Sequence, residues 1–147
     1  MDETYKTLNT VLVRLFNDIM TIEEKAITSG EFSNITNNDM HVIDAIGIAE
    51  PRNMSSIAKS LSVTVGTLTI AVNNLVKKGY VNRVRSEKDR RVVLISLTAK
   101  GRKAYQHHQK FHDEMIKSVI AGMDPQEIQI LERALSNLIG FFDHPHI

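Results

Sequence analysis

The sequence predicts a mainly α-helical domain that carries one small β-hairpin and pairs with a second copy of itself. Apolar residues recur every three or four positions in long segments near both ends of the chain, which is the spacing of amphipathic helices. Only residues 80–97 contain runs in which apolar and polar residues alternate, as in two short paired strands. The terminal segments carry more apolar face than one small domain buries, so we expect a second copy to cover it.

The composition excludes several classes of function. With 42% hydrophobic and 24% charged residues, the 147-residue chain has the mixture of a single globular domain, residues 1–147. The absence of cysteine excludes disulfides, thiolate catalysis and cysteine-based metal sites. An acidic start and the lack of a long uncharged apolar run predict a soluble cytoplasmic protein with no membrane partner. Since neither a glycine-rich phosphate loop nor a nucleophile elbow occurs, we expect no enzyme and no cofactor.

Long amphipathic helices are predicted at both ends of the chain. Residues 5–29 form the first of them. Thr98 is the predicted cap of a second one, and Asp124 begins the last helix, with a proline at its first position and Glu127 completing a capping box. We expect residues 5–29 and 98–142 to interlock with the same segments of a second chain in an obligate homodimer.

The middle of the chain, residues 38–97, has the order of a helix-turn-helix followed by a hairpin. After a helix that begins near Asn38, Ser55 and the serine after it are the predicted cap of a short helix. Thr64 is the predicted N-cap of the next helix, which Gly79 ends. With the strand pair that follows, this order predicts a winged helix-turn-helix lobe, in which the helix after the turn enters a DNA groove.

The charge is distributed unevenly, although the net charge is only +1. Residues 52–103 hold 12 Lys and Arg but only two acids, a net charge of +10. The flanking segments, residues 1–51 and 104–147, have net charges of −6 and −3. A basic block between acidic flanks indicates a polyanionic partner, here double-stranded DNA, with a solvated basic face as the alternative.

The predicted DNA contacts lie on the helix after the turn, on the wing and at the start of the short helix. Residues 64–76 contain no charged residue, whereas an ordinary exposed helix, the alternative, usually carries Glu and Lys. Short hydroxyl and amide side chains allow close approach to base edges and phosphates. The candidate residues are Ser55, Thr64, Val65, Gly66, Thr67, Thr69, Asn73, Asn74, Lys77, Arg83, Lys88, Asp89, Arg90 and Arg91.

The wing tip carries an acid among its basic residues. Asp89 is out of place before phosphates unless it holds an arginine in position. A narrow and strongly negative minor groove attracts an inserted arginine. The choice between Arg90 and Arg91 stays open, and the Asp-x-Arg spacing favours Arg91; a solvated turn is the alternative.

Several segments together resemble the MarR family of dimeric winged-helix regulators. They are Gly66-Thr67-Leu68-Thr69, the Leu75-x3-Gly79-Tyr80-Val81 ending, Asp89-Arg90-Arg91 and Leu97-Thr98-x2-Gly101. Within the family, further segments resemble the repressors of fatty-acid synthesis: Ile22-Glu23-Glu24, Asp39-Met40-His41-x2-Asp44-x2-Gly47, Val84-Arg85-Ser86-Glu87 and Phe111-His112-x2-Met115. The resemblance implies repression at an inverted-repeat operator, with a long acyl group on acyl carrier protein as corepressor.

An acyl chain needs an apolar and deformable site. Methionine adapts well to a flexible alkyl chain. The residues expected to line a tunnel between the long helices and the winged part are Leu15, Ile19, Met20, Met40, Ile43, Phe111 and Met115. The alternative is that these residues are ordinary core.

A second family resemblance concerns metal. His108 and His112 are four residues apart, a spacing known from metal pairs. Some MarR members sense zinc through such a pair together with an acid on the first helix and a histidine on the second, and Glu24 and His41 match those places. The expectation is no metal. The alternatives are a zinc-responsive repressor, a regulator of another small hydrophobic ligand, or histidines that only bind acids such as Glu24 inside the dimer.

Overall fold

The computed structural model describes residues 2–28 and 30–143, a part of the chain that contains six helices and a three-stranded sheet. This content confirms the predicted fold class. No single helix among the described residues combines the length and the apolar character needed to cross a membrane. The chain divides into two compact units, residues 1–111 and 112–147. The elements are α1 (Glu3–Thr28), α2 (Asn37–Ile46), β1 (Arg52–Asn53), α3 (Met54–Leu61), α4 (Val65–Lys77), β2 (Val81–Arg85), β3 (Val93–Leu97), α5 (Ala99–Ile120) and α6 (Pro125–Asp143).

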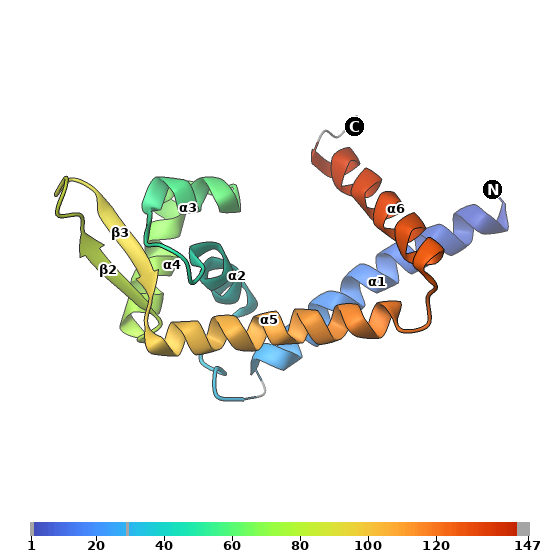
Figure 1. Ribbon diagram of the computed structural model, residues 1–147, viewed down its shortest axis with the longest axis horizontal. Helices are drawn as coiled ribbons and strands as arrows, with labels where there is room; N and C mark the ends of the chain where they lie inside the picture. The colour runs from blue at the N-terminus through green and yellow to red at the C-terminus, as the bar shows by residue number, and fades with distance from the viewer. Residues whose placement is uncertain (1, 29, 144–147) are drawn as a thin grey trace. The chain divides into compact units, whose positions relative to one another are not determined.

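The core of the first unit lies among α2, α3, α4 and the sheet (Figure 1). Leu68, Val72 and Leu75 form the buried stripe of α4, and each is at most 1% exposed. Their spacing of four and three residues places them on one side of the helix, as the sequence predicted. Ile43 of α2 and Ile57 of α3 are fully buried in the same core. The packing of these three helices fixes the orientation of α4.

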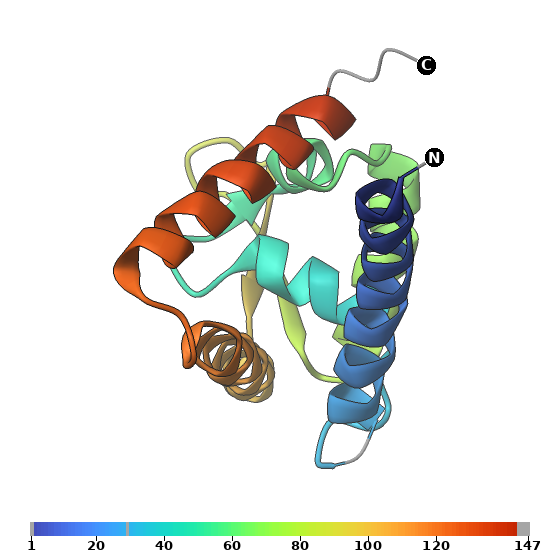
Figure 2. The same ribbon diagram turned by 90° about the vertical axis from the view of Figure 1, so that its right-hand side faces the viewer.

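The sheet is antiparallel with the strand order β1-β3-β2. Strands β2 and β3 pair from Val81 with Leu97 to Arg85 with Val93, which confirms the predicted hairpin. Figure 2 shows α2 in front of the strands, and α2 contacts β3. Strand β1 was not predicted, because a strand of two residues has no period that the sequence could reveal.

Local capping interactions fix where most helices begin and end. Thr64 Oγ1 accepts a hydrogen bond from Thr67 N at 3.1 Å, which confirms the predicted cap of α4. Beyond the end of this helix, Gly79 has a φ of +84°, a value that favours glycine. At α6, Asp124 Oδ1 accepts from Glu127 N at 2.9 Å and Glu127 Oε1 accepts from Asp124 N at 3.1 Å. The predicted capping box is therefore present.

The predicted cap of α3 is wrong. Asn53 is the N-cap residue, and its Oδ1 accepts from Ser56 N at 2.8 Å. Ser55 lies inside the first turn of the helix instead. Asparagine caps helices as well as serine does, and Asn53 stands where β1 ends in an extended backbone conformation. The cap thus depends on a strand that the sequence did not reveal.

Helices α1 and α6 expose apolar side chains along their length. An exposed apolar surface of this kind marks an interaction site in a globular protein. It supports the predicted pairing of the terminal helices, and the homodimer itself stays a prediction. On α1 the exposed residues are Tyr5, Leu8, Val11, Leu12, Val13, Leu15, Phe16, Met20 and Ile22. Helix α6 has no buried residue and exposes Ile130, Leu135, Ile139, Phe141 and Phe142.

The start of α5 is pressed against the chain that enters the wing. A Cβ atom at Gly101 would lie 2.1 Å from Tyr80 O and 3.2 Å from Leu97 Cβ. Thr98 Oγ1 donates to Gly79 O at 2.6 Å, and Thr98 N donates to Tyr80 O at 3.0 Å. Only glycine fits this approach, so residue 101 determines where α5 leaves the lobe.

Gly101→Ala is therefore expected to lower the free energy of unfolding by about 1–3 kcal/mol, because the added methyl group displaces the Tyr80 carbonyl. Gly66→Ala is the matched control, since a Cβ atom there meets no atom closer than 3.8 Å. Urea unfolding at one fixed protein concentration measures both variants. A Gly101→Ala protein as stable as the wild type would contradict the close approach.

Candidate nucleic-acid interface

Helix α4 presents short polar side chains on the face opposite its buried stripe. Because Leu68, Val72 and Leu75 point into the core, the positions on the opposite side of the helix face outward. No acidic or basic side chain interrupts this face before Lys77. The predicted contacts that are exposed on or beside this helix are Thr64, Val65, Gly66, Thr67, Asn73, Asn74 and Lys77.

The two threonines of this face differ in what they offer a ligand. Thr69 is half-buried, and its hydroxyl donates to Val65 O at 2.7 Å inside the helix. Its proton is therefore already engaged. Thr67 is exposed, and its Oγ1 accepts from Thr64 Oγ1 at 3.0 Å, so its own hydroxyl proton remains for an outside acceptor. Of these two predicted contacts, Thr67 is the better placed.

A side-chain pair connects the wing to α4. The Arg83 guanidinium on β2 donates to Asn73 Oδ1 on α4. The bond directs the amide nitrogen of Asn73, which can only donate, away from Arg83. The structure thus brings together two residues that the sequence placed in the interface separately.

The wing tip holds one arginine in a fixed fork. Arg91 Nε lies 3.1 Å from Asp89 Oδ1, and Arg91 Nη2 lies 3.1 Å from Asp89 Oδ2. These hydrogen bonds from Arg91 hold the pKa of Asp89 below its usual range. Arg85 Nη1 donates to Arg90 O at 2.9 Å and braces the same loop. The expected Asp89–Arg91 pairing is present, and Arg91 stays exposed.

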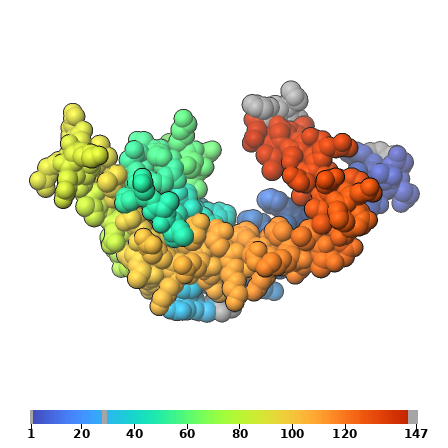
Figure 3. Space-filling view, in the orientation of Figure 1, coloured from blue at the N-terminus to red at the C-terminus, as the bar shows by residue number. Residues whose placement is uncertain are grey.

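A groove of about 330 Å³ lies where the wing meets α3, and it joins two predicted contacts. Ser55 in the first turn of α3 and Arg91 of the wing both line it. Beyond it, the β2–β3 hairpin projects from the lobe (Figure 3). Lys88, near the tip of this projection, is exposed.

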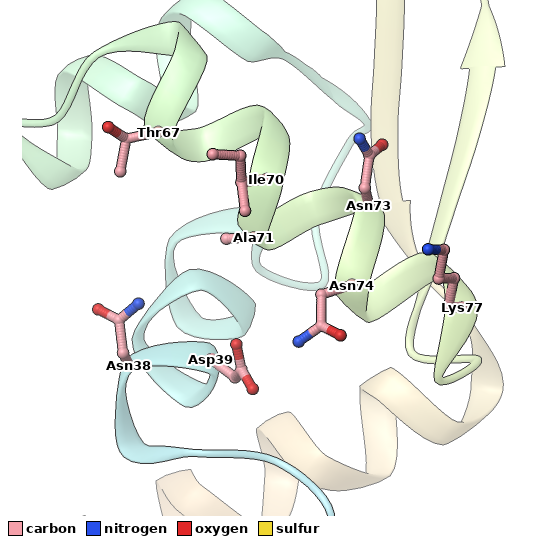
Figure 4. Close-up of a pocket in the computed structure, with 8 residues that line it drawn as sticks. All are labelled: Asn38, Asp39, Thr67, Ile70, Ala71, Asn73, Asn74 and Lys77. Carbon is pink, nitrogen blue, oxygen red and sulfur yellow. The ribbon is translucent and has the colours of Figure 1, made fainter.

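A second groove of about 580 Å³ runs between α2 and α4 (Figure 4). Asn38 and Asp39 of α2 form one wall, and α4 forms the other. Because this groove adjoins the polar face of α4, the first turn of α2 borders the candidate interface. The residues that line it on α4 are Thr67, Ile70, Ala71, Asn73, Asn74 and Lys77.

Two cations of the basic block brace the lobe. The Arg52 guanidinium donates to Ala45 O and, at 2.7 Å, to Ser56 Oγ. Lys78 Nζ donates to Asn34 O at 2.5 Å. Their side chains are held by the fold, and both cations keep their positive charge.

The residues predicted to hold an acyl chain differ in their environments. Met40 and Ile43 are buried in the lobe core, at 1% and 0% exposure. Leu15 and Met20 are exposed on α1, and Ile19 beside them is half-buried. Phe111 and Met115 are half-buried on α5. The tunnel stays a prediction.

His108 of α5 is buried between two carboxylates. Its Nε2 lies 2.7 Å from Glu23 Oε1 of α1, and its Nδ1 lies 2.8 Å from Asp44 Oδ2 of α2. His41 Nε2 is 3.7 Å from the same Glu23 oxygen. Glu23, one residue before the expected Glu24, thus contacts both of these histidines.

These contacts shift the pKa of His108. Burial lowers the pKa of the imidazole, but the carboxylates of Asp44 and Glu23 outweigh burial, and the pKa of His108 is raised above 6.5. Glu23, His41 and His108 carry ligand atoms that zinc accepts, and here the Glu23 carboxylate contacts both imidazoles. The metal hypothesis, with Glu24, His41, His108 and His112, stays untested.

Comparisons with known proteins agree on one class of protein, the transcriptional regulators. The family model described as "Transcriptional regulator SarA/Rot" matches residues 28–108. The regulator YhjH of Bacillus subtilis is 26% identical over 77% of this chain, and the match spans 66% of YhjH, just under two thirds of its length.

Solved structures extend the likeness to most of the chain. Streptococcus pneumoniae FabT in complex with DNA is 42% identical, with 95% of this chain and 97% of that one covered and a TM-score of 0.89. Wild-type apo MarR of E. coli is 27% identical, with 86% and 96% covered and a TM-score of 0.61.

The stability of the folded protein is expected to decrease as the pH rises above 6.5. The raised pKa of His108 favours the folded state wherever the imidazole is protonated. This contribution is complete below the pKa of the unfolded residue and is lost as the pH rises through the folded-state pKa. Urea unfolding between pH 6 and 9 measures it. In Asp44→Asn the decrease should be smaller, and an equal decrease in both proteins would contradict the assignment.

Proposed function

The chain belongs to the SarA/Rot family of transcriptional regulators and has the MarR-type winged-helix fold, and from this premise we propose that it represses genes of fatty-acid synthesis. The observation that carries the proposal is the likeness to FabT, at 42% identity over nearly the full length of both chains. FabT was solved in complex with DNA. The sequence segments that resemble fatty-acid-synthesis repressors direct the proposal to these genes.

The proposed DNA complex follows from the geometry of the lobe. Helix α4 enters the major groove with its polar face, and Arg91 of the wing enters the adjacent minor groove. A homodimer formed by the apolar faces of the terminal helices presents two such lobes. Its operator is an inverted repeat with half-sites about 34 Å apart.

The proposed corepressor is acyl carrier protein that carries a long acyl chain. Its alkyl chain would lie in a tunnel lined by the apolar residues of α1, α2 and α5 named above, among them Met20, Met40 and Met115. Binding would increase the population of the dimer in which lobe separation matches the operator. The effect is limited by the difference in ligand affinity between the two states.

Anisotropy of a labelled promoter duplex from a fatty-acid-synthesis gene tests the proposal. We expect long-chain acyl carrier protein to tighten binding, and the unacylated carrier to have no effect. Met115→Trp should keep basal DNA binding and lose the response, because the indole fills the tunnel. Lys117→Trp, two positions along α5 at an exposed residue, is the matched control. A response to zinc in place of the acyl carrier would favour the metal alternative.

Arg91→Ala is expected to weaken operator binding and to reduce the slope of log affinity against log salt by about 1, because one phosphate-facing cation is lost. Lys117→Ala removes one exposed cation from α5, outside the lobe, and should leave the slope unchanged. Titrations at four or more salt concentrations measure both slopes. If both variants keep the wild-type slope, Arg91 does not lie in the interface.

A further inference from the structure

Ile70 stands exposed in the middle of the polar face of α4. At 74% exposure it is the most exposed large apolar side chain among the described residues. Thr67 lies one turn before it and Asn73 one turn after it on the same side of the helix (Figure 4). The polar residues that face outward therefore surround an isoleucine.

The fold itself does not explain this residue. Isoleucine is a weaker helix former than alanine or lysine, so it does not favour the helix at an exposed position. The core contact of this turn comes from the neighbouring Ala71, which packs against the buried cluster. On α1 and α6 many exposed apolar residues lie near one another along the helix, whereas Ile70 lies among hydroxyl and amide side chains. Its side chain is therefore open to contact from outside the chain.

The surroundings of Ile70 specify the chemistry of that partner. The side chains that flank Ile70 are polar. Lys77 and Arg83 add positive charge beside Asn73, toward the C-terminal end of α4. An apolar protein surface would leave these groups without water or partners. In the major groove of DNA, base edges offer hydrogen-bonding groups together with one apolar group, the C5 methyl of thymine. A polar face with one prominent apolar residue at its centre matches this pattern.

We infer that Ile70 is a specificity-determining residue that contacts a thymine methyl group in each operator half-site. The inference rests on the proposed binding of operator DNA. The stiff β-branched side chain suits a contact of fixed shape, because it loses little rotamer freedom when it is covered. The contacted base pair lies next to those read by Thr67 and Asn73.

Replacement of thymine by deoxyuridine tests the contact, because it removes the methyl group and leaves base pairing intact. The full-length protein first selects duplexes from a randomised inverted-repeat library. In the selected duplex, each thymine is then replaced by deoxyuridine at symmetric positions, and affinities are measured. We expect one position at which the replacement lowers the affinity of the wild type about fourfold per methyl group. This is the affinity that burial of one apolar carbon contributes.

Three variants distinguish a contact made by Ile70 from other causes of a preference for thymine. Ile70→Ala should bind thymine and deoxyuridine duplexes equally well at that position, and Ile70→Val should keep part of the difference. Ile48→Ala, the matched control at another exposed isoleucine of the lobe, should discriminate like the wild type. Undiminished discrimination in Ile70→Ala, or none in the wild type, overturns the inference. Failure to select any duplex would instead contradict the proposed function.

Discussion

The burial of one stripe on α4 determines which side chains the lobe presents to a partner. Leu68, Val72 and Leu75 are inserted into the core, and a helix turns by about 100° per residue. A shift of this stripe by a single position would turn Thr67 and Asn73 away from the exposed face. The bond between Arg83 and Asn73 then relates the wing to the same helix. A packing requirement thereby sets the register of the candidate interface.

Tyr80 joins the other parts of the lobe to this helix. Its ring is fully buried, and the centroids of the Tyr80 and Phe32 rings are 6.4 Å apart. Its hydroxyl donates to Asn34 Oδ1 at 2.6 Å. Its carbonyl accepts from Thr98 N, where α5 begins. The loop after α1, the end of α4 and the start of α5 thus meet at one residue. The close approach of Gly101 follows from this meeting.

Sequence reasoning succeeded where the determinants are local. The cap at Thr64, the capping box at Asp124 and the Asp89–Arg91 pair each involve residues within three positions of one another, and all are present. The hairpin was visible because two short runs that contain β-branched residues flank a charged polar loop. Such features follow from short-range geometry, so a single sequence reveals them.

Features that depend on tertiary contacts were missed. The Asn53 cap depends on β1, which forms only because β3 pairs with it. Counting charges did not show that the Arg52 and Lys78 side chains bind carbonyl oxygens of the lobe. The contacts of Glu23 with His41 and His108 depend on how α1 packs beside α2 and α5. Helical spacing places Ile70 on the face opposite the buried stripe, but how far its side chain is exposed depends on the packing around α4.

The position of His108 has a structural consequence. Its imidazole ring on α5 links Glu23 of α1 to Asp44 of α2, and separating these buried polar groups leaves them without partners. The three helices therefore meet at one buried side chain. Since α2 also packs against α4, this junction lies one helix away from the candidate interface.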